Sequence, residues 1–112
     1  MVIGADMNGH VGVNTAGYEG AHGGYGYGNR HEEGISLLEM AQGLDLVIAN
    51  TCFKKRDEHL ITYCRGPYAS QIDFLLLRQA DRKYLQDCKV IPGEAAVKQH
   101  RVVVMNMKLH TV

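Results

Sequence analysis

The sequence predicts a mixed α/β protein in which one main helix packs on a mostly antiparallel sheet, as a partial α/β-sandwich. Three observations predict this class. Apolar residues recur at helical spacing in one segment, from Gly34 to Ala41. Short apolar runs typical of buried strands precede and follow that segment. Further runs flank a turn at Gly66 and Pro67, which indicates a hairpin and therefore antiparallel pairing.

The first half of the chain contains the first predicted strand, a long loop and the helix. Residues 1–5 are an apolar run and predict a buried strand, whereas residues 9–28 lack periodicity and predict a loop. The helix is expected to begin after Asn29, its predicted N-cap, and to end before Gly43, its predicted C′ residue, with Leu44 folding back on Leu38. Its apolar face has four residues at helical spacing: Gly34, Leu37, Leu38 and Ala41.

The second half is predicted to be mostly strands. They cover residues 44–49, 60–64, 70–77, 88–91 and 101–109. The second and third of these are expected to pair as a hairpin, and Pro92 with Gly93 is expected to end the fourth. Residues 81–86 predict a helical turn. No repeat or linker is visible, so residues 1–112 are interpreted as a single domain. Because an apparently inner strand begins at the first residue, we expect this domain to be partial.

Charge and composition exclude several classes of protein. Twelve Lys and Arg balance twelve Asp and Glu, which excludes a strongly basic nucleic-acid-binding arm and an acidic tail. Local basic clusters at Lys54–Arg56 and Arg78–Lys83 could still contact DNA phosphates, and a solvated surface is the alternative interpretation. Three cysteines without a paired spacing favour a reducing compartment. No apolar run reaches the roughly 20 residues of a membrane span. We therefore expect an intracellular protein, nuclear or cytoplasmic, neither secreted nor membrane-bound, and its oligomeric state stays open.

Polar residues at the ends of predicted strands form the candidate site. Asp6 and Asn8 follow the first strand, where a carboxylate and an amide suit a metal-activated water and a phosphate oxygen; a plain turn is the alternative. Asp73 interrupts an apolar strand, where a carboxylate is costly unless it is paired, although it could instead lie on a solvated face. His100 precedes the last strand and could donate a proton or bind phosphate, or be an ordinary surface histidine. We expect Asp73 to pair with His100 and fix its tautomer, with the other two residues facing the same pocket.

The glycine-rich segment at residues 23–28 has the composition of a dinucleotide-binding turn but the wrong spacing. About fifteen residues separate it from the preceding strand, so the tight strand–turn–helix geometry is lost. No Gly-Lys-Ser/Thr follows, which excludes a phosphate loop of that type. The glycines are instead expected to let the loop turn, with Tyr18, Tyr25 and Tyr27 packing across it; stacking of these rings on bases is the alternative.

Several motifs, in order along the chain, resemble those of the endonuclease/exonuclease/phosphatase superfamily. Residues 5–8 resemble its Gly-Asp-x-Asn motif, residues 70–74 its Ile-Asp-Tyr strand motif, and Gln99-His100 stands in the place of its Ser-Asp-His motif. Longer strings are similar to the endonuclease domains of RTE/BovB-type non-LTR retrotransposons; they occupy residues 8–12, 23–28, 45–51 and 59–63. The resemblance implies that the chain has the C-terminal half of that superfamily's α/β-sandwich fold.

The resemblance also implies a DNA endonuclease that hydrolyses phosphodiester bonds with Mg²⁺ or Mn²⁺. Asp6 would orient or activate the attacking water, Asn8 would hold the scissile phosphate, and both would face the metal. His100 would contact the phosphate and stabilise its developing charge, oriented by Asp73. In such chemistry, positioning and charge neutralisation supply most of the rate enhancement.

Two departures from the family pattern bear on activity. Gln99 replaces an Asp of the family motif, and an amide lacks that negative charge. The resemblance also places the family's metal-binding Glu upstream of Met1, so Asp6 and Asn8 alone would make a poor Mg²⁺ site. We therefore expect the chain by itself to be weakly active or inactive. The alternative function is a non-catalytic, retroelement-derived remnant that acts as a binding or interaction module.

Overall fold

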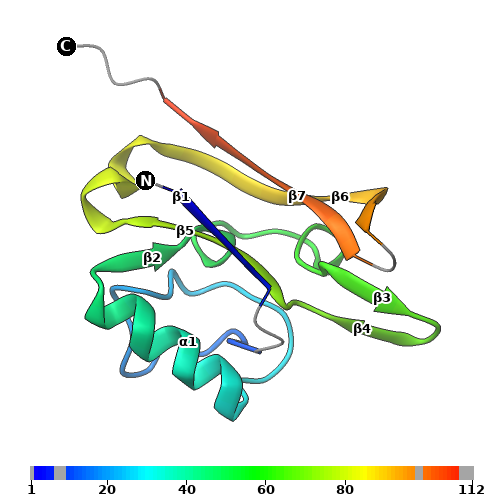
Figure 1. Cartoon of the computed structure of the whole chain (residues 1–112), viewed down its shortest axis with the longest axis horizontal. Helices are drawn as coiled ribbons and strands as arrows, with labels where there is room; N and C mark the ends of the chain where they lie inside the picture. The colour runs from blue at the N-terminus through cyan, green and yellow to red at the C-terminus, as the bar shows by residue number, and fades with distance from the viewer. Residues whose placement is uncertain (1, 7–9, 98–99, 109–112) are drawn as a thin grey trace.

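The computed structural model describes residues 2–6, 10–97 and 100–108, and gives only the backbone for residues 2, 3, 5, 6 and 93–97. The chain forms three layers, in which a helix covers one face of a three-stranded sheet and a four-stranded sheet covers the other (Figure 1). This arrangement confirms the predicted class, a mixed α/β fold with one main helix and antiparallel strands.

The three-stranded sheet is the middle layer. Its order is β1 (Val2–Asp6), β5 (Asp73–Arg78), β2 (Leu46–Ile48), and both pairings are antiparallel. The register of β1 on β5 sets the main chain of Asp6 opposite that of Asp73. The end of the first predicted strand therefore meets the carboxylate that interrupts a later one.

The four-stranded sheet contains the rest of the strands. Its order is β4 (Tyr68–Ser70), β3 (Tyr63–Arg65), β7 (His100–Met107), β6 (Leu85–Val97), again antiparallel. The strand β3 meets β7 at a single pair, Tyr63 and His100. This pairing places the start of β7 beside the β3–β4 hairpin.

The helix α1 (Glu32–Gly43) packs on the middle layer through the predicted face, since Gly34, Leu37, Leu38 and Ala41 are all buried. The described residues also form three short 3₁₀ segments: η1 (Ala49–Thr51), η2 (Asp57–His59) and η3 (Gln79–Tyr84). Within the described part of the chain, no helix is long and apolar enough to cross a membrane.

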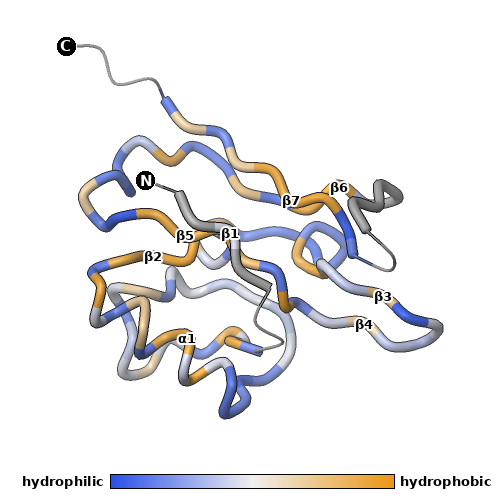
Figure 2. The backbone as a smooth tube through the Cα atoms, viewed as in Figure 1, coloured by the Kyte–Doolittle hydropathy of each residue, from blue (hydrophilic) through white to orange (hydrophobic). Residues whose placement is uncertain are grey.

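The alternation of side chains along β5 produces two apolar cores. Phe74 and Leu76 point toward the helix, where they join residues of α1 and of the long loop. Leu77 points the other way and packs with Val47, Cys88 and partly buried side chains of β7. Because side chains alternate across a strand, one central strand supports both interfaces. Hydrophobic residues accordingly concentrate in β2, β5 and β7 (Figure 2).

The ends of the helix differ from the prediction. The N-cap is His31 rather than Asn29, and its side chain makes no capping hydrogen bond. The amide of His31 donates to the carbonyl of His10, so a contact with a distant part of the chain sets the start of the helix. Gly43 is the last helical residue, and Asp45 rather than Gly43 takes the left-handed conformation expected of the C′ residue. Leu44 is 62% exposed and is not part of the core on which the helix packs.

Two strand predictions are also wrong in detail. The expected strand at residues 70–77 is split, because Tyr68–Ser70 pair with β3 in one sheet and Asp73–Arg78 join the other. The hairpin is therefore β3–β4. Pro92 and Gly93 do not end their strand, since β6 continues to Val97 and a register shift between Ile91 and Ala95 accommodates them.

Candidate functional site

The structure brings Asp73 and His100 together. Oδ2 of Asp73 lies 2.7 Å from Nδ1 of His100, and both side chains are about one-fifth exposed. A carboxylate only accepts hydrogen bonds, so Nδ1 carries the proton and donates a hydrogen bond to Asp73. In the neutral ring, the lone pair is then on Nε2. The pairing that the sequence predicts is present, and the two residues come from different sheets.

Several strand ends converge on this pair. β5 begins at Asp73, β7 begins at His100, and β1 ends at Asp6, whose main chain lies opposite Asp73. The ring of Tyr63, at the start of β3, packs edge-on against the ring of His100 with centroids 5.0 Å apart. The site therefore occupies one end of the two-sheet stack, where side chains from several strands meet.

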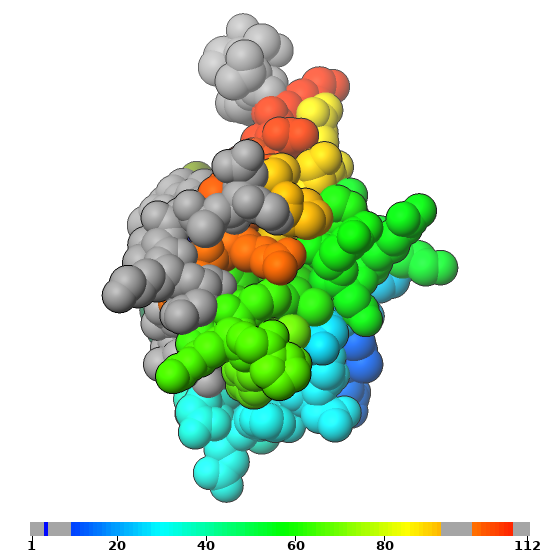
Figure 3. Space-filling model, turned by 90° about the vertical axis from the view of Figure 1, so that its right-hand side faces the viewer, coloured from blue at the N-terminus to red at the C-terminus, as the bar shows by residue number. Residues whose placement is uncertain are grey.

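A pocket of about 350 Å³ opens beside the pair. Its lining comes from the loop before α1, the β3–β4 hairpin, the connection from β4 to β5 and the start of β7: His10, Tyr63, Tyr68, Ser70, Ile72 and His100. On this side of the molecule the hairpin (green) lies between β7 (orange) and α1 with its preceding loop (cyan) (Figure 3). Oγ of Ser70 is buried and has no hydrogen-bond partner among the described residues. A buried hydroxyl without a hydrogen-bond partner is energetically unfavourable, so a polar group that enters the pocket and bonds to Ser70 would be stabilised there.

His10 is a pocket residue that the sequence reasoning did not single out. Its ring stacks on that of His31, with centroids 4.5 Å apart. Burial lowers the pKa of His10 below its usual 6.5, the nearby charge of His31 lowers it further, and Glu33 acts in the opposite direction. At neutral pH the His10 ring is thus uncharged and suited to hydrogen bonding. In the sequence, the sign that His10 belongs to the site is its position within residues 8–12, one of the strings that resemble retrotransposon endonuclease domains.

The proposed metal ligands are only partly within the described structure. Asn8 and Gln99 lie outside the described residues, and for Asp6 only the main chain is described. Among the residues that are described, no three His, Cys, Asp or Glu side chains come together as a metal site. The Asp73 carboxylate and the His100 ring are engaged with each other. The described donors alone therefore do not fit a Mg²⁺ site, which needs several oxygen ligands.

The glycine-rich loop has a structural role. A Cβ atom at Gly23 or Gly26 would collide with backbone atoms of Thr51 or Gly12, respectively. The amide of Gly23 also donates to Oγ1 of Thr51, and Tyr25 is 40% exposed. Of the three tyrosines expected to pack across the loop, Tyr18 does contact the core. The glycines thus allow the loop to pack closely against η1 and against its own earlier part at Gly12.

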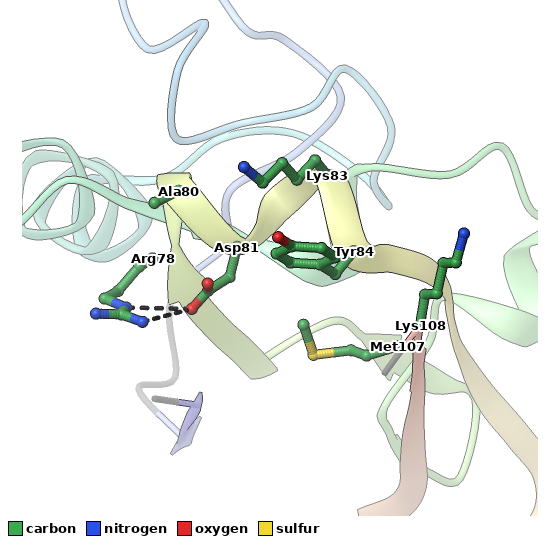
Figure 4. A pocket seen from close by; sticks show the side chains of 7 residues that line it. All are labelled: Arg78, Ala80, Asp81, Lys83, Tyr84, Met107 and Lys108. Atoms are coloured by element: carbon green, nitrogen blue, oxygen red, sulfur yellow. Dashed lines mark hydrogen bonds and ion pairs between the residues drawn. The ribbon is translucent and has the colours of Figure 1, made fainter. Parts of the chain in front are cut away.

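A second pocket, of about 600 Å³, lies at the opposite end of β5 and β7 (Figure 4). It is separated from Asp73 by the length of β5, about 17 Å at ~3.3 Å per residue. Arg78 and Asp81 point toward each other across a 3.1 Å ion pair, and the Tyr84 ring lies near Lys83 and Met107. This pocket contains none of the predicted site residues. The basic cluster at Arg78 is partly neutralised by its own acidic neighbour.

Comparison with known proteins gives a limited but specific result. The chain is 33% identical over 106 residues to craniofacial development protein 2 of Bos taurus and 32% identical over 106 residues to that of Tragulus javanicus. Each match covers 93% of this chain, and the chain spans 18% of the length of these curated relatives. No protein-family model matches the chain, and no solved structure does. The similarity thus runs along almost the whole chain but concerns a small part of each relative.

Proposed function

We propose that this chain supplies the phosphate-contacting part of a metal-dependent phosphodiesterase site that acts on DNA. The observation that carries the proposal is the 2.7 Å contact between Asp73 and His100, at the end of the sheets where Asp6 lies opposite Asp73 in the register. The motif resemblance supports the same site. Mg²⁺ or Mn²⁺ would be held by Asp6 and Asn8, together with ligands beyond those that the structure describes.

The chemistry of the pair follows from its hydrogen bond. Asp73 holds the imidazole of His100 in one orientation and one tautomer, with the proton on Nδ1 and the acceptor lone pair on Nε2. With a proton also on Nε2, the ring can donate that N–H to a phosphate oxygen while Nδ1–H stays bonded to Asp73. Donation to an oxygen that gains charge in the transition state lowers the barrier. Asp73 is the positioning residue and His100 the catalytic one.

Plasmid nicking tests this proposal. The chain, alone and in an N-terminally extended form, is incubated with supercoiled DNA and Mg²⁺, and conversion to the open circle is measured. Replacing His100 or Asp73 by Ala is expected to slow nicking by about 100-fold or more. His59→Ala is the matched control, since this partly buried histidine also bonds through Nδ1, to the Val90 carbonyl, but does not line the pocket.

The outcomes separate cleanly. Nicking that depends on Mg²⁺ and on His100, but not on His59, supports the proposal. Nicking by neither form, or nicking that is unchanged in Asp6→Ala and His100→Ala, contradicts it.

Gln99 favours a second candidate function, a non-catalytic binding module. An amide stands where the resembled family has an acidic residue, so one negative charge is missing from the proposed metal site. Restoring the acid with Gln99→Asp separates the two functions. A gain of nicking in that variant, from an inactive parent, identifies a degenerate nuclease that retains the rest of the site. Binding of DNA without cleavage by both proteins supports the binding module.

A further inference from the structure

Two buried polar side chains hold the main chain of Asp73. Oγ1 of Thr62 accepts hydrogen bonds from the amides of Ile72 and Asp73, each at 3.0 Å. Nδ2 of Asn50 donates to the carbonyl of Asp73 at 3.1 Å, and its Oδ1 accepts from the amide of Leu75 at 2.8 Å. Thr62 is 0% exposed and Asn50 is 4% exposed. The N–H and C=O of Asp73 are therefore both bonded to buried side chains.

Asn50 and Thr62 bond to the part of β5 that lies beyond the end of β2. The last pair between β2 and β5 joins Ile48 to Leu76, so the edge of β5 from Asp73 to Leu75 extends beyond that strand. The amide group of Asn50 continues the ladder there, because it offers a donor and an acceptor with the spacing of a strand residue. An apolar residue would bury more favourably at either position unless the hydrogen bonds were needed.

Thr62 also holds the partner of Asp73. Its carbonyl accepts a 2.7 Å hydrogen bond from the amide of Arg101, the residue after His100. The next residue, Tyr63, pairs with His100 in the sheet. A single buried threonine thus fixes the backbone of one member of the pair through its hydroxyl and that of the other through its carbonyl. The two members belong to different sheets, so no strand pairing does this directly.

We propose that Thr62 is a positioning residue that sets the Asp73–His100 hydrogen bond, with Asn50 as its support on the other side of Asp73. The inference rests on the proposed function for its catalytic meaning, but not for its geometry. Removing the hydroxyl oxygen releases two backbone amides at the start of β5 and allows the Asp73 carboxylate to move from Nδ1 of His100. The protein then loses control of which ring nitrogen carries the proton.

The test compares variants of the two buried threonines. Thr62→Val removes the oxygen while keeping the shape, and Thr62→Ser retains the oxygen. Thr51→Val is the matched control: Thr51 is also 0% exposed and its Oγ1 also makes two hydrogen bonds, but to Gly23 and Ile48 rather than to the site. Proton–nitrogen NMR spectra of the imidazole rings, assigned with His100→Ala, report the ratio of the two neutral tautomers of His100.

The expected result is a ratio of Nδ1–H to Nε2–H that falls about threefold or more in Thr62→Val, as for a lost hydrogen bond. Thr62→Ser should keep the wild-type ratio, and Thr51→Val should lose stability with the ratio unchanged. An unchanged ratio in Thr62→Val, or an equal fall in Thr51→Val, overturns the proposal. If Thr62→Val unfolds, the spectra are recorded in sucrose, which favours the folded state.

Nicking measured on the same variants separates this inference from the function on which it rests. No nicking by any variant, with the tautomer ratio responding as expected, refutes the proposed function and leaves the positioning role of Thr62 intact. Nicking that survives in Thr62→Val with an altered ratio shows that the tautomer is set by Thr62 but is not needed for cleavage, which overturns the catalytic part of the inference.

Discussion

Acidification is expected to destabilise the protein through His22, a buried histidine of the glycine-rich loop. His22 is 1% exposed, its Nδ1 accepts from the amide of Gly24 at 3.0 Å, and its Nε2 lies 2.7 Å from the carbonyl of Gly12. Only the neutral ring with its proton on Nε2 satisfies both partners. Protonation would add an N–H at Nδ1 that points at the amide N–H of Gly24. The loop would lose that hydrogen bond, and two donors would face each other.

The sign of the effect follows from the pKa of His22. Burial lowers this pKa below the ordinary 6.5, the charge of Arg30 lowers it further, and the bond to the Gly12 carbonyl acts in the opposite direction. At a pH between the lowered pKa of His22 in the folded protein and the ordinary pKa in the unfolded chain, only the unfolded chain binds the extra proton. The free energy of unfolding therefore falls as the pH falls. The stabilisation is complete above pH 6.5, decreases by at most about 1.4 kcal/mol per pH unit below it, and is lost once the pH has fallen through the folded pKa.

Urea unfolding of the wild type and of His22→Gln, from about pH 8 to about pH 5, measures the contribution of His22 to the free energy of unfolding. Gln keeps a donor and an acceptor but does not titrate. The variant should be less stable at neutral pH by about 1–3 kcal/mol because its bonds fit less well. Its stability should also fall less steeply below pH 6.5. His10, whose pKa is also lowered, contributes equally to both proteins and cancels in the difference. Parallel curves for the two proteins would refute the assignment.

Three other outcomes are expected. Gly34→Ala should lower the free energy of unfolding in urea by about 1–3 kcal/mol, because its Cβ would overlap a backbone carbonyl of the preceding loop. The Cβ of Gly43→Ala meets nothing within 4 Å, so that variant should be neutral or stabilising by up to ~1 kcal/mol in the same assay. Phe74→Ala should cost about 3–5 kcal/mol in the same assay, since Phe74 is 1% exposed in the helix-side core. Cys88 is buried and its pKa is raised to about 12, so mass spectrometry after brief alkylation at about pH 8 should find Cys64 modified well before it; equal labelling would contradict this.

The helix shows what periodicity predicts and what it does not. Its buried face follows from the spacing of Gly34, Leu37, Leu38 and Ala41, because residues three and four apart share one side of any helix. Its start does not follow from local sequence. The amide of His31 bonds to the carbonyl of His10, which is more than twenty residues away in the chain, so Asn29 never becomes the cap that its residue type favours.

The break between β4 and β5 has a similar cause. The segment at residues 70–77, which is mostly apolar from Ile72 onward, predicts a single strand, yet the chain leaves one sheet for the other after Ser70. At this crossing the hydroxyl oxygen of Thr62 accepts hydrogen bonds from the amides of Ile72 and Asp73. Local pattern contains no sign of that bond, because its acceptor belongs to a different segment. The same limit explains why Thr62 and His10 were not singled out as site residues.

The pairing of Asp73 with His100 was accessible to sequence reasoning for a physical reason. A carboxylate inside an apolar strand needs a partner, and a histidine at the start of another strand can supply the N–H. The contact bridges two sheets, so its length depends on how those sheets pack through Val47, Leu77 and Cys88. The geometry of the pair is thus a property of the inter-sheet core and of the buried threonine beside it, rather than of a surface loop. A site built in this way orients its histidine before any substrate binds, which is the preorganisation that the proposed function would require.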